Sequence, residues 1–303
     1  MLITMEMIEV EAFAAIADHG SFTRAAAALR LSQPAISRRI ELLERELKAP
    51  LFERVHGGTS LTDAGRAFLP HARRVLASAR DGAAAVRGVE DEEAGTVTLA
   101  LVGTLASTPL TAQLQAFRVA HPRIRLALRT ARSDEVGALV ASGEAHLGLR
   151  YFADPRPEIT SRLVREEALL AVCAGQSTLM VDTPADTRAL EGRPWVAFPV
   201  GTGSSGEPFG RVLERQLLRH GLEDAEIVVA DSLTAQKRLI EADFGLGLLP
   251  TSAVEEELRL GTLRALPLAD LAVTIPVLLL HRRHGYLGRA ARHLLDALTG
   301  ADV

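Results

Sequence analysis

Residues 21–47, SFTRAAAALRLSQPAISRRIELLEREL, predict two short helices joined by a tight turn. Ser21 or Thr23 can cap the first helix, whose four consecutive alanines form helix readily and allow another helix to pack closely. Ser32 can cap the second helix. Pro34 is tolerated there because the N–H that proline lacks has no partner in a first helical turn. This stretch fixes the fold of the N-terminal region.

The second helix has one apolar face and one outward face. Its apolar residues step along the chain by four, three and four: Ile36, Ile40, Leu43 and Leu47. This stripe leaves four residues on adjacent outward columns, Gln33, Pro34, Ser37 and Arg38. Glutamine and arginine can form bidentate hydrogen bonds with adenine and guanine edges in the major groove of DNA. We therefore expect these four residues to contact bases.

The charge distribution supports a local contact with DNA. The chain of 303 residues has 34 basic and 38 acidic side chains and a net charge of −4, which argues against binding nucleic acid through overall charge. From His19 to Ile40, however, there is no acid, and four arginines are present: Arg24, Arg30, Arg38 and Arg39. A localised positive surface is expected.

A hairpin is expected directly after these helices. Pro50–Arg54 and a second strand around Thr59–Leu61 flank Gly57 and Gly58, a dipeptide suited to a tight turn. Such a wing would make Arg54 available for a phosphate. The alternative is a small helical subdomain with a solvated basic face. The joint occurrence of caps, buried stripe, acid-free face and wing favours a winged helix-turn-helix.

A long helix is predicted over residues 62–90. Thr62 can cap it, and an apolar or small seam follows at alternating spacings of four and three: Phe68, Ala72, Val75, Ala79, Gly82 and Val86. This spacing is typical of a coiled-coil contact. An ordinary amphipathic helix packed on its own domain is the alternative interpretation.

An acidic, polar break at Gly88–Gly95 separates this region from a second pattern, in which strands alternate with helices. The expected strands are Thr96–Val102, Ile124–Thr130, His146–Arg150, Ala168–Ala174, Trp195–Pro199, Glu226–Ala230 and Gly245–Leu249. We therefore expect an α/β fold with mainly parallel sheets. The expected domains are residues 1–61, a linker helix 62–90 and a C-terminal domain 95–303.

The segment FAAIADHGSFTRAAAALRLSQPAISRRIELLERELKAPLFER at 13–54, with LTDAGRAF at 61–68, closely resembles the DNA-binding domain of LysR-type transcriptional regulators. The resemblance covers about the first 90 residues. It implies base contacts by Gln33, Pro34, Ser37 and Arg38, and phosphate contacts near Ser21, Thr23, Arg39 and Arg54. It also implies dimerisation through the linker helix at Phe68, Ala72, Val75, Ala79 and Val86. A two-fold dimer predicts a near-palindromic double-stranded operator. The sequence leaves a dimer or a tetramer open.

Residues 101–150, from LVGT to LGLR, continue to resemble LysR-type regulators, whose effector domain is similar to periplasmic binding proteins of type 2. The resemblance implies two lobes, the first over about 95–166 and 271–303 and the second over about 167–270. A small-molecule effector would bind between them, and the transcription machinery would be a further partner.

We expect that effector to be an anion, with a carboxylate as its charged group and Arg150 as its main partner. Arg150 follows an expected strand and precedes the connection to the second lobe. The alternative is that Arg150 forms a structural ion pair with Asp154 or Glu166. The expected effector-binding residues are Thr104, Ser107, Arg132, Arg150, Phe198, Thr202 and Ser204.

Other function classes find less support. Gly201–Gly206 spells Gly-x-Gly-x-x-Gly with Asp231 farther on, as in dinucleotide-binding proteins, but Glu207 would place a carboxylate beside the pyrophosphate. We find no hydrolase, transferase or zinc motif, and therefore expect no enzyme activity, cofactor or metal. A solute-binding protein for uptake would have to be exported and would not need a DNA-binding domain. The single cysteine, Cys173, lies in an apolar run, and a cytoplasmic protein without membrane spans is expected.

Overall fold

The computed structural model describes residues 4–55, 58–87, 95–178, 190–200, 208–268 and 273–300, without the side chains of residues 54, 55, 84, 87, 108 and 208. The chain divides into two compact units. The first comprises Met1–Asp91 with Ala141–Glu144 and His284–Gly288, and the second comprises the remainder. The main division falls within the acidic break between the two sequence patterns.

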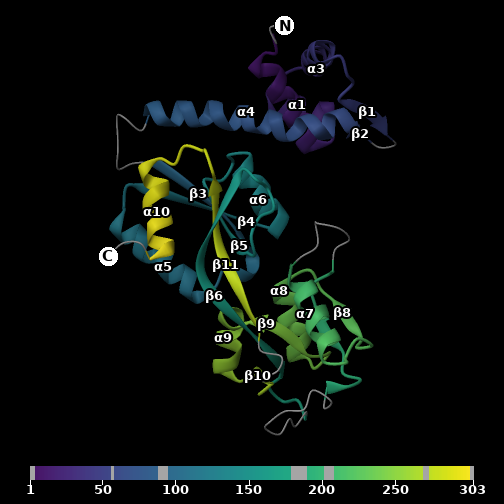
Figure 1. Cartoon of the computed structure of the whole chain (residues 1–303), viewed down its shortest axis with the longest axis vertical. Coiled ribbons are helices and arrows are strands. Elements are labelled where there is room, and N and C mark those ends of the chain that lie inside the picture. The colour runs from purple at the N-terminus through teal and green to yellow at the C-terminus, as the bar shows by residue number, and fades with distance from the viewer. Residues whose placement is uncertain are drawn as a thin grey trace. The chain divides into compact units, whose positions relative to one another are not determined.

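Three helices, a hairpin and a long helix form the N-terminal unit (Figure 1). They are α1 (Met7–His19), α2 (Phe22–Ala28), α3 (Gln33–Leu47), β1 (Phe52–Val55), β2 (Gly58–Leu61) and α4 (Asp63–Arg87). β1 and β2 pair antiparallel, with Phe52 opposite Leu61. This is the winged helix-turn-helix with linker helix that the sequence predicts.

Side-chain caps define where these helices begin. Ser21 Oγ accepts a hydrogen bond from the backbone N–H of Arg24 at 3.4 Å, so Ser21 rather than Thr23 caps α2. Ser32 Oγ accepts from the N–H of Ala35 at 3.3 Å at the start of α3. Thr62 Oγ1 accepts from the N–H of Gly65 at 3.0 Å at the start of α4. Each cap satisfies an N–H that has no partner within its helix.

Aromatic packing joins the wing and the long helix to the core of this unit. The ring centroid of Phe13 lies 5.3 Å from that of Phe52 and 5.1 Å from that of Phe68. Gly65 permits the close approach of α4 to the wing, because a Cβ there would lie 2.1 Å from the carbonyl oxygen of Leu51. Any larger residue would therefore push α4 away from the hairpin.

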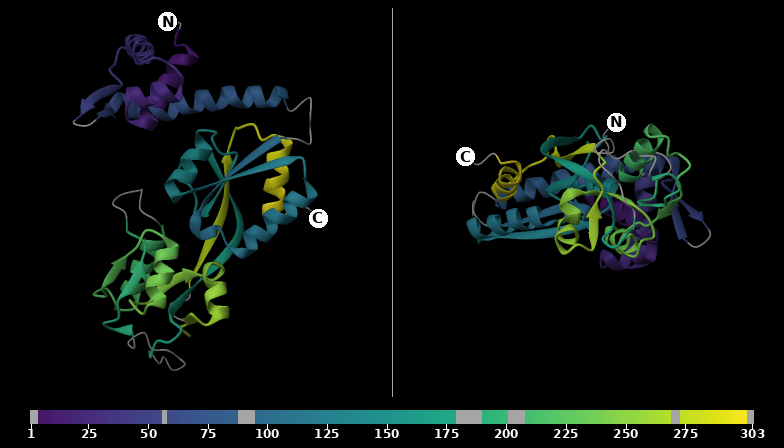
Figure 2. Two further views of the ribbon diagram at one scale, coloured as in Figure 1. Left: turned by 180° about the vertical axis from the view of Figure 1, so that it is seen from behind. Right: turned by 90° about the horizontal axis from the view of Figure 1, so that it is seen from below.

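The first lobe of the C-terminal unit contains three parallel strands with helical crossovers. Its elements are β3 (Gly95–Val102), the short 3-10 turn η1 (Gly103–Leu105), α5 (Thr108–Ala120), β4 (Ile124–Ala131), α6 (Ser133–Ala141), β5 (Leu147–Tyr151) and α10 (Arg289–Thr299). α10 lies beside α5 (Figure 2), where the rings of His121 and His293 stack at 4.6 Å. The end of the chain thus returns to the first lobe.

The second lobe contains the elements β7 (Trp195–Ala197), α7 (Pro208–Arg219), β8 (Ile227–Val229), α8 (Leu233–Glu241), β9 (Gly247–Pro250), α9 (Thr251–Leu260) and β10 (Leu263–Ala265). Apolar side chains from its strands and helices form one buried cluster, which includes Val172, Val196, Ile240, Leu249 and Val254. The two-lobed α/β architecture is therefore as expected.

Two long strands, β6 (Ile159–Ala174) and β11 (Val273–Arg282), run side by side from one lobe into the other (Figure 1). They pair antiparallel over the whole length of β11, with one register shift between Val277 and Leu278. They lie in a seven-stranded sheet of order β10-β6-β11-β5-β3-β4, in which β9 also pairs with β6.

The expectation of mainly parallel sheets is wrong for this sheet. β11 pairs antiparallel with both β5 and β6, and β9 and β10 pair antiparallel with β6. The expected strands also omitted β10, β11 and the first half of β6. The physical reason is that the chain passes between the lobes twice in opposite directions, so the strands that connect them must be antiparallel.

Candidate DNA-binding surface and ligand cavity

The first turns of α3 present polar side chains outward, while the other face of the helix is buried. Ile36 and Leu43 are fully buried, whereas Gln33, Pro34 and Arg38 are exposed and Ser37 is half-buried. Arg38 forms no ion pair with any residue that the structure describes. Four side chains proposed to contact bases thus lie on one accessible surface, which we call the α3 face.

Two residues of the α3 face are hydrogen-bonded to each other. The amide Nε2 of Gln33 donates a hydrogen bond to Ser37 Oγ at 3.1 Å, one helical turn farther along. This contact joins side chains four residues apart, which face the same side of a helix. The Gln33 amide is therefore oriented before any DNA arrives.

The candidates for phosphate contacts come from three elements, α2 with its N-terminal cap, α3 and β1. Ser21 is half-buried at the start of α2, Thr23 is exposed two residues later, and Arg39 is half-buried on α3. Arg54 belongs to β1, opposite Thr59, but its side chain lies outside the described part of the chain. The surface can thus supply hydroxyl and guanidinium donors around the α3 face.

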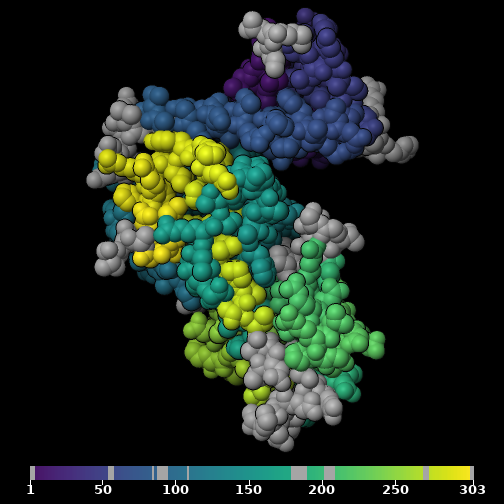
Figure 3. Space-filling model, in the orientation of Figure 1, coloured from purple at the N-terminus to yellow at the C-terminus, as the bar shows by residue number. Residues whose placement is uncertain are grey.

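The expected seam of α4 divides into two parts. Phe68 and Ala72 pack into the hydrophobic core of their own unit, and Ala72 is only 1% exposed. Ala72 therefore has no surface to offer a partner, because α1 already covers this part of α4. Farther along, Val75 is 40% exposed, Val86 is 72% exposed, and Ala79 and Gly82 are also exposed. Figure 3 shows α4 as a continuous blue band that extends beyond the other helices of its unit.

A cavity of about 710 Å³ lies between the lobes of the C-terminal unit. Four helices begin at its wall, and each contributes a serine at or near its first residue: Ser107 of α5, Ser133 of α6, Ser232 of α8 and Ser252 of α9. The cavity therefore lies at the carboxyl ends of strands, where α/β proteins bind ligands.

Three aromatic side chains form one part of the wall: Tyr151, Phe198 and Phe209. The rings of Tyr151 and Phe209 meet edge to face, with centroids 4.7 Å apart. The Tyr151 hydroxyl is buried and has no hydrogen-bond partner of good geometry among the described residues. Burial, followed by the negative charge of Glu167, raises the pKa of Tyr151 above its usual range, so the phenol stays protonated.

A lysine and a glutamate line the second-lobe side of the cavity. Lys237 Nζ of α8 lies 2.6 Å from Glu257 Oε1 of α9 and donates to the carbonyl oxygen of Ala253 at 3.2 Å. The second carboxylate oxygen, Glu257 Oε2, is buried without a partner among the described residues. This ion pair joins two helices at the cavity wall.

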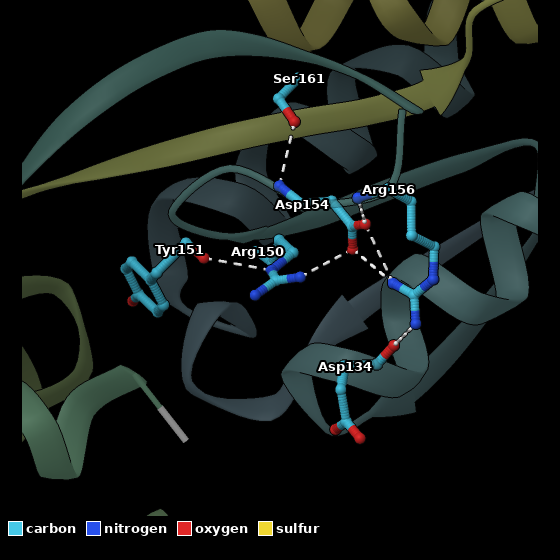
Figure 4. A network of polar contacts seen from close by, with 6 residues as sticks. All are labelled: Asp134, Arg150, Tyr151, Asp154, Arg156 and Ser161. Atoms are coloured by element: carbon cyan, nitrogen blue, oxygen red, sulfur yellow. Dashed lines mark hydrogen bonds and ion pairs between the residues drawn. The ribbon is translucent and has the colours of Figure 1, made fainter. Parts of the chain in front are cut away.

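Arg150, which the sequence suggested as the effector's charge partner, is held by groups of the protein itself. Its Nη1 donates to Asp154 Oδ2 at 2.8 Å and its Nε donates to the carbonyl oxygen of Tyr151 (Figure 4). Asp154 also pairs with Arg156, which reaches the carbonyl oxygen of Asp134 in α6. Arg150 is buried and is absent from the cavity lining. The alternative of a structural ion pair with Asp154 is the observed arrangement.

Four of the other expected effector-binding residues do line the cavity: Thr104, Ser107, Arg132 and Phe198. Thr202 and Ser204, like the Gly201–Gly206 motif, lie outside the described residues. The sequence reading missed Tyr151, Lys237, Ser252 and Glu257. A usable signal was present in the serines that follow β8 and β9, which repeat the strand-serine-helix pattern of the first lobe.

Comparisons with known proteins match both parts of the chain to family models. Residues 8–66 match the bacterial regulatory helix-turn-helix protein family of lysR type, and residues 90–302 match the LysR substrate binding domain. The chain belongs to the LysR family. It is therefore a DNA-binding transcriptional regulator with a ligand-binding domain, as its sequence predicted.

Curated relatives of this regulator cover most of its length. The HTH-type transcriptional regulator TcbR of a Pseudomonas species is 32% identical over 252 residues, which span 82% of this chain and 83% of TcbR. The HTH-type transcriptional regulator TfdS of Cupriavidus pinatubonensis is 29% identical over 274 residues, or 90% and 91% of the two chains. These relatives are named as regulators rather than as enzymes.

Solved structures support the same fold. Full-length CbnR in complex with its target DNA matches with a TM-score of 0.57 and 25% identity, over 97% of this regulator and all of that chain. A full-length OxyR variant from Pseudomonas aeruginosa matches with a TM-score of 0.70 and 18% identity, over 97% and 94%. Among the described residues, no helix of this regulator is long and apolar enough to span a membrane.

Proposed function

We propose that this regulator reads a near-palindromic operator through the α3 face of two subunits, and that a small molecule in the inter-lobe cavity modulates transcription. Gln33, Pro34, Ser37 and Arg38 contact bases, while Ser21, Thr23, Arg39 and Arg54 contact phosphates. The dimer forms along the exposed part of α4 at Val75, Ala79 and Val86.

The α3 face carries this proposal. A recognition helix enters the major groove with its N-terminal part. The first turns of α3 expose an amide, a hydroxyl and a guanidinium without an ion-pair partner among the described residues, while the acids Glu41, Glu44 and Glu46 come later in the helix. This polarity keeps negative side chains away from the phosphates.

Selection of bound DNA from a random pool tests the proposal. The purified full-length chain should enrich an inverted repeat whose half-sites lie about one helical turn of DNA apart, or a multiple of that spacing. Protection of both half-sites in footprinting should follow. Enrichment of an asymmetric sequence, or of no sequence, would contradict binding by a two-fold symmetric dimer.

The ligand-dependent part of the proposal rests on the cavity. A small molecule that binds the folded protein stabilises it against heat, and a regulator must couple that binding to DNA. A compound that raises the melting temperature of the C-terminal unit should therefore also change operator affinity or transcription in a reconstituted assay.

We also propose that the protein works in the cytoplasm, where its operator lies, and that it catalyses no reaction. Support comes from the names of TcbR and TfdS, which describe regulators, and from the reader face of α3. Localisation of a fluorescent fusion over the nucleoid, lost on disruption of the α3 face, would test the first statement.

A further inference from the structure

The cavity wall carries more negative than positive charge among the described residues. Four acids and two bases line it: Glu135, Asp231, Glu256, Glu257, Arg132 and Lys237. Both bases have partners within the protein. Lys237 pairs with Glu257 at 2.6 Å, and Nε of Arg132, a largely exposed side chain, lies 3.7 Å from Asp134. With Arg150 also paired, each of these three bases already has an acidic neighbour.

Protein carboxylates already occupy two of the helix starts that could have bound an anion. Glu135 Oε2 accepts a hydrogen bond from the backbone N–H of Arg132 at 3.0 Å, just before α6. Glu167 Oε1 accepts from the N–H of Ser252 at 3.0 Å in the first turn of α9. A third start, that of α8, is preceded by Asp231 in the cavity lining. An anionic ligand would compete with each of these charges.

Buried polar atoms of the lining still need hydrogen-bond partners. Glu257 Oε2 and Ser252 Oγ are buried without one among the described residues, and Tyr151 Oη, beside the Thr104 side chain, lacks one of good geometry there. Tyr151 is 2% exposed and the side chain of Glu257 is 11% exposed. A buried carboxylate oxygen without a donor is costly, because it has lost water without gaining a replacement. A hydrogen-bond donor brought to Glu257 would lower this cost.

The aromatic part of the wall suits an apolar body attached to that donor. Tyr151 and Phe209 meet edge to face, and the ring centroids of Phe198 and Phe209 lie 6.0 Å apart. Aromatic faces attract organic cations as well as apolar groups, because their π electrons carry partial negative charge. Ring faces and carboxylates thus favour the same class of ligand.

We propose that the inter-lobe cavity binds a primary amine on an aromatic or apolar body, with the ammonium group toward Glu257 and the body against Tyr151, Phe198 and Phe209. This inference rests on the proposed function, in which a small molecule occupies the same cavity. It replaces the expected carboxylate with a group of opposite charge.

Thermal unfolding of the full-length protein with three probes of one shape tests the charge preference. Benzylamine, benzyl alcohol and benzoate share a ring and differ in the charge of the attached group. At neutral pH and equal concentration, benzylamine should stabilise the C-terminal unit most, by about 3 to 5 °C at tenfold excess over its Kd. Benzyl alcohol should have a smaller effect and benzoate none. Stabilisation by benzoate, or by no probe, overturns the inference.

Variants separate the cavity from general charge effects. Glu257→Gln should abolish the preference for benzylamine over benzyl alcohol, while Glu255→Gln, at an exposed position of the same helix outside the lining, should retain it. Asp231→Asn provides a second test that leaves the Lys237–Glu257 pair intact and should reduce the preference. An unchanged preference in both Glu257→Gln and Asp231→Asn contradicts the site.

DNA binding by the same preparations distinguishes a wrong ligand class from a wrong DNA-binding surface. Operator selection without ligand does not depend on what the cavity binds. If selection succeeds and benzylamine is not preferred, the proposed ligand class is wrong but the proposed DNA-binding function is retained. If selection fails, the proposed reader is wrong whatever the probes show.

Discussion

Arg150 Nη1 and Asp154 Oδ2 lie 2.8 Å apart in an ion pair whose side chains are 8% and 0% exposed. Arg156 approaches the same carboxylate oxygen at 2.7 Å. One buried aspartate thus holds two guanidinium groups, one on the strand β5 and the other bonded to α6. The aspartate fixes the segment after Tyr151 against the first lobe, next to the cavity wall.

Asp154→Asn should destabilise the C-terminal unit strongly. Removal of one partner from a buried ion pair costs about 3 to 5 kcal/mol, because the remaining charges stay buried. For a unit of this size the melting temperature should fall by on the order of 10 °C. Arg150→Met should cost less, since Arg156 still pairs with Asp154. The exposed Arg162→Met is the matched control, and an equal loss there would contradict the assignment.

Arg38→Ala should weaken binding to the selected operator by about 1 to 3 kcal/mol and binding to scrambled DNA much less, because a base contact carries discrimination. Arg54→Ala should reduce both affinities together. Arg45→Ala removes the same charge from an exposed position near the end of α3 and serves as the control. Fluorescence anisotropy on both DNAs measures the difference. Equal losses on the two DNAs for Arg38→Ala would remove it from the base-reading set.

Val75→Asp should weaken dimerisation without unfolding the N-terminal unit, because Val75 is exposed in the single chain and a carboxylate would be buried at the interface. Arg74→Asp, about 100° around the helix, should leave assembly intact. Phe68→Asp should instead unfold the unit, since Phe68 packs on Phe13. Sedimentation and circular dichroism separate these outcomes. A dimer that survives Val75→Asp shows that the interface lies elsewhere.

Tyr151→Phe should change how the stability of the C-terminal unit depends on pH above about 10. Burial raises the pKa of Tyr151 above the ordinary value of 10.0, so the unfolded chain loses this proton at lower pH than the folded one. The resulting stabilisation is fully present below about pH 10 and is lost as the pH rises toward the folded pKa. Above pH 10, the free energy of unfolding of the wild-type protein should therefore fall more steeply with pH than that of Tyr151→Phe. Parallel pH curves would contradict a buried phenol.

The N-terminal unit was predictable because its signals are local. Ser21, Ser32 and Thr62 cap helices through bonds to residues three positions away. The spacing of Ile36, Ile40 and Leu43 alone fixes which side of α3 is buried. Family resemblance added the roles of the outward residues, which remain predictions.

The cavity was less predictable because its parts meet across long stretches of chain. Whether Arg150 faces a ligand or Asp154 depends on side-chain direction after β5, and both were compatible with the sequence. Lys237 and Glu257 come from separate helices, and their pairing depends on how α8 and α9 pack. The strand β11 has an apolar run that the sequence shows, but its antiparallel partner lies far away in the chain.

The paired strands β6 and β11 limit how the two lobes can move. Their ladder extends from Val273, opposite Leu169, to Arg282, opposite Ile159. A slip of one residue would turn every side chain of a strand to the other face of the sheet and break the ladder. Sliding of one lobe past the other is therefore costly, whereas bending is cheaper where the register already shifts, between Val277 and Leu278. The two lobes can therefore bend relative to each other about this point. An occupant of the cavity can change the angle between the lobes but not the register of β6 and β11.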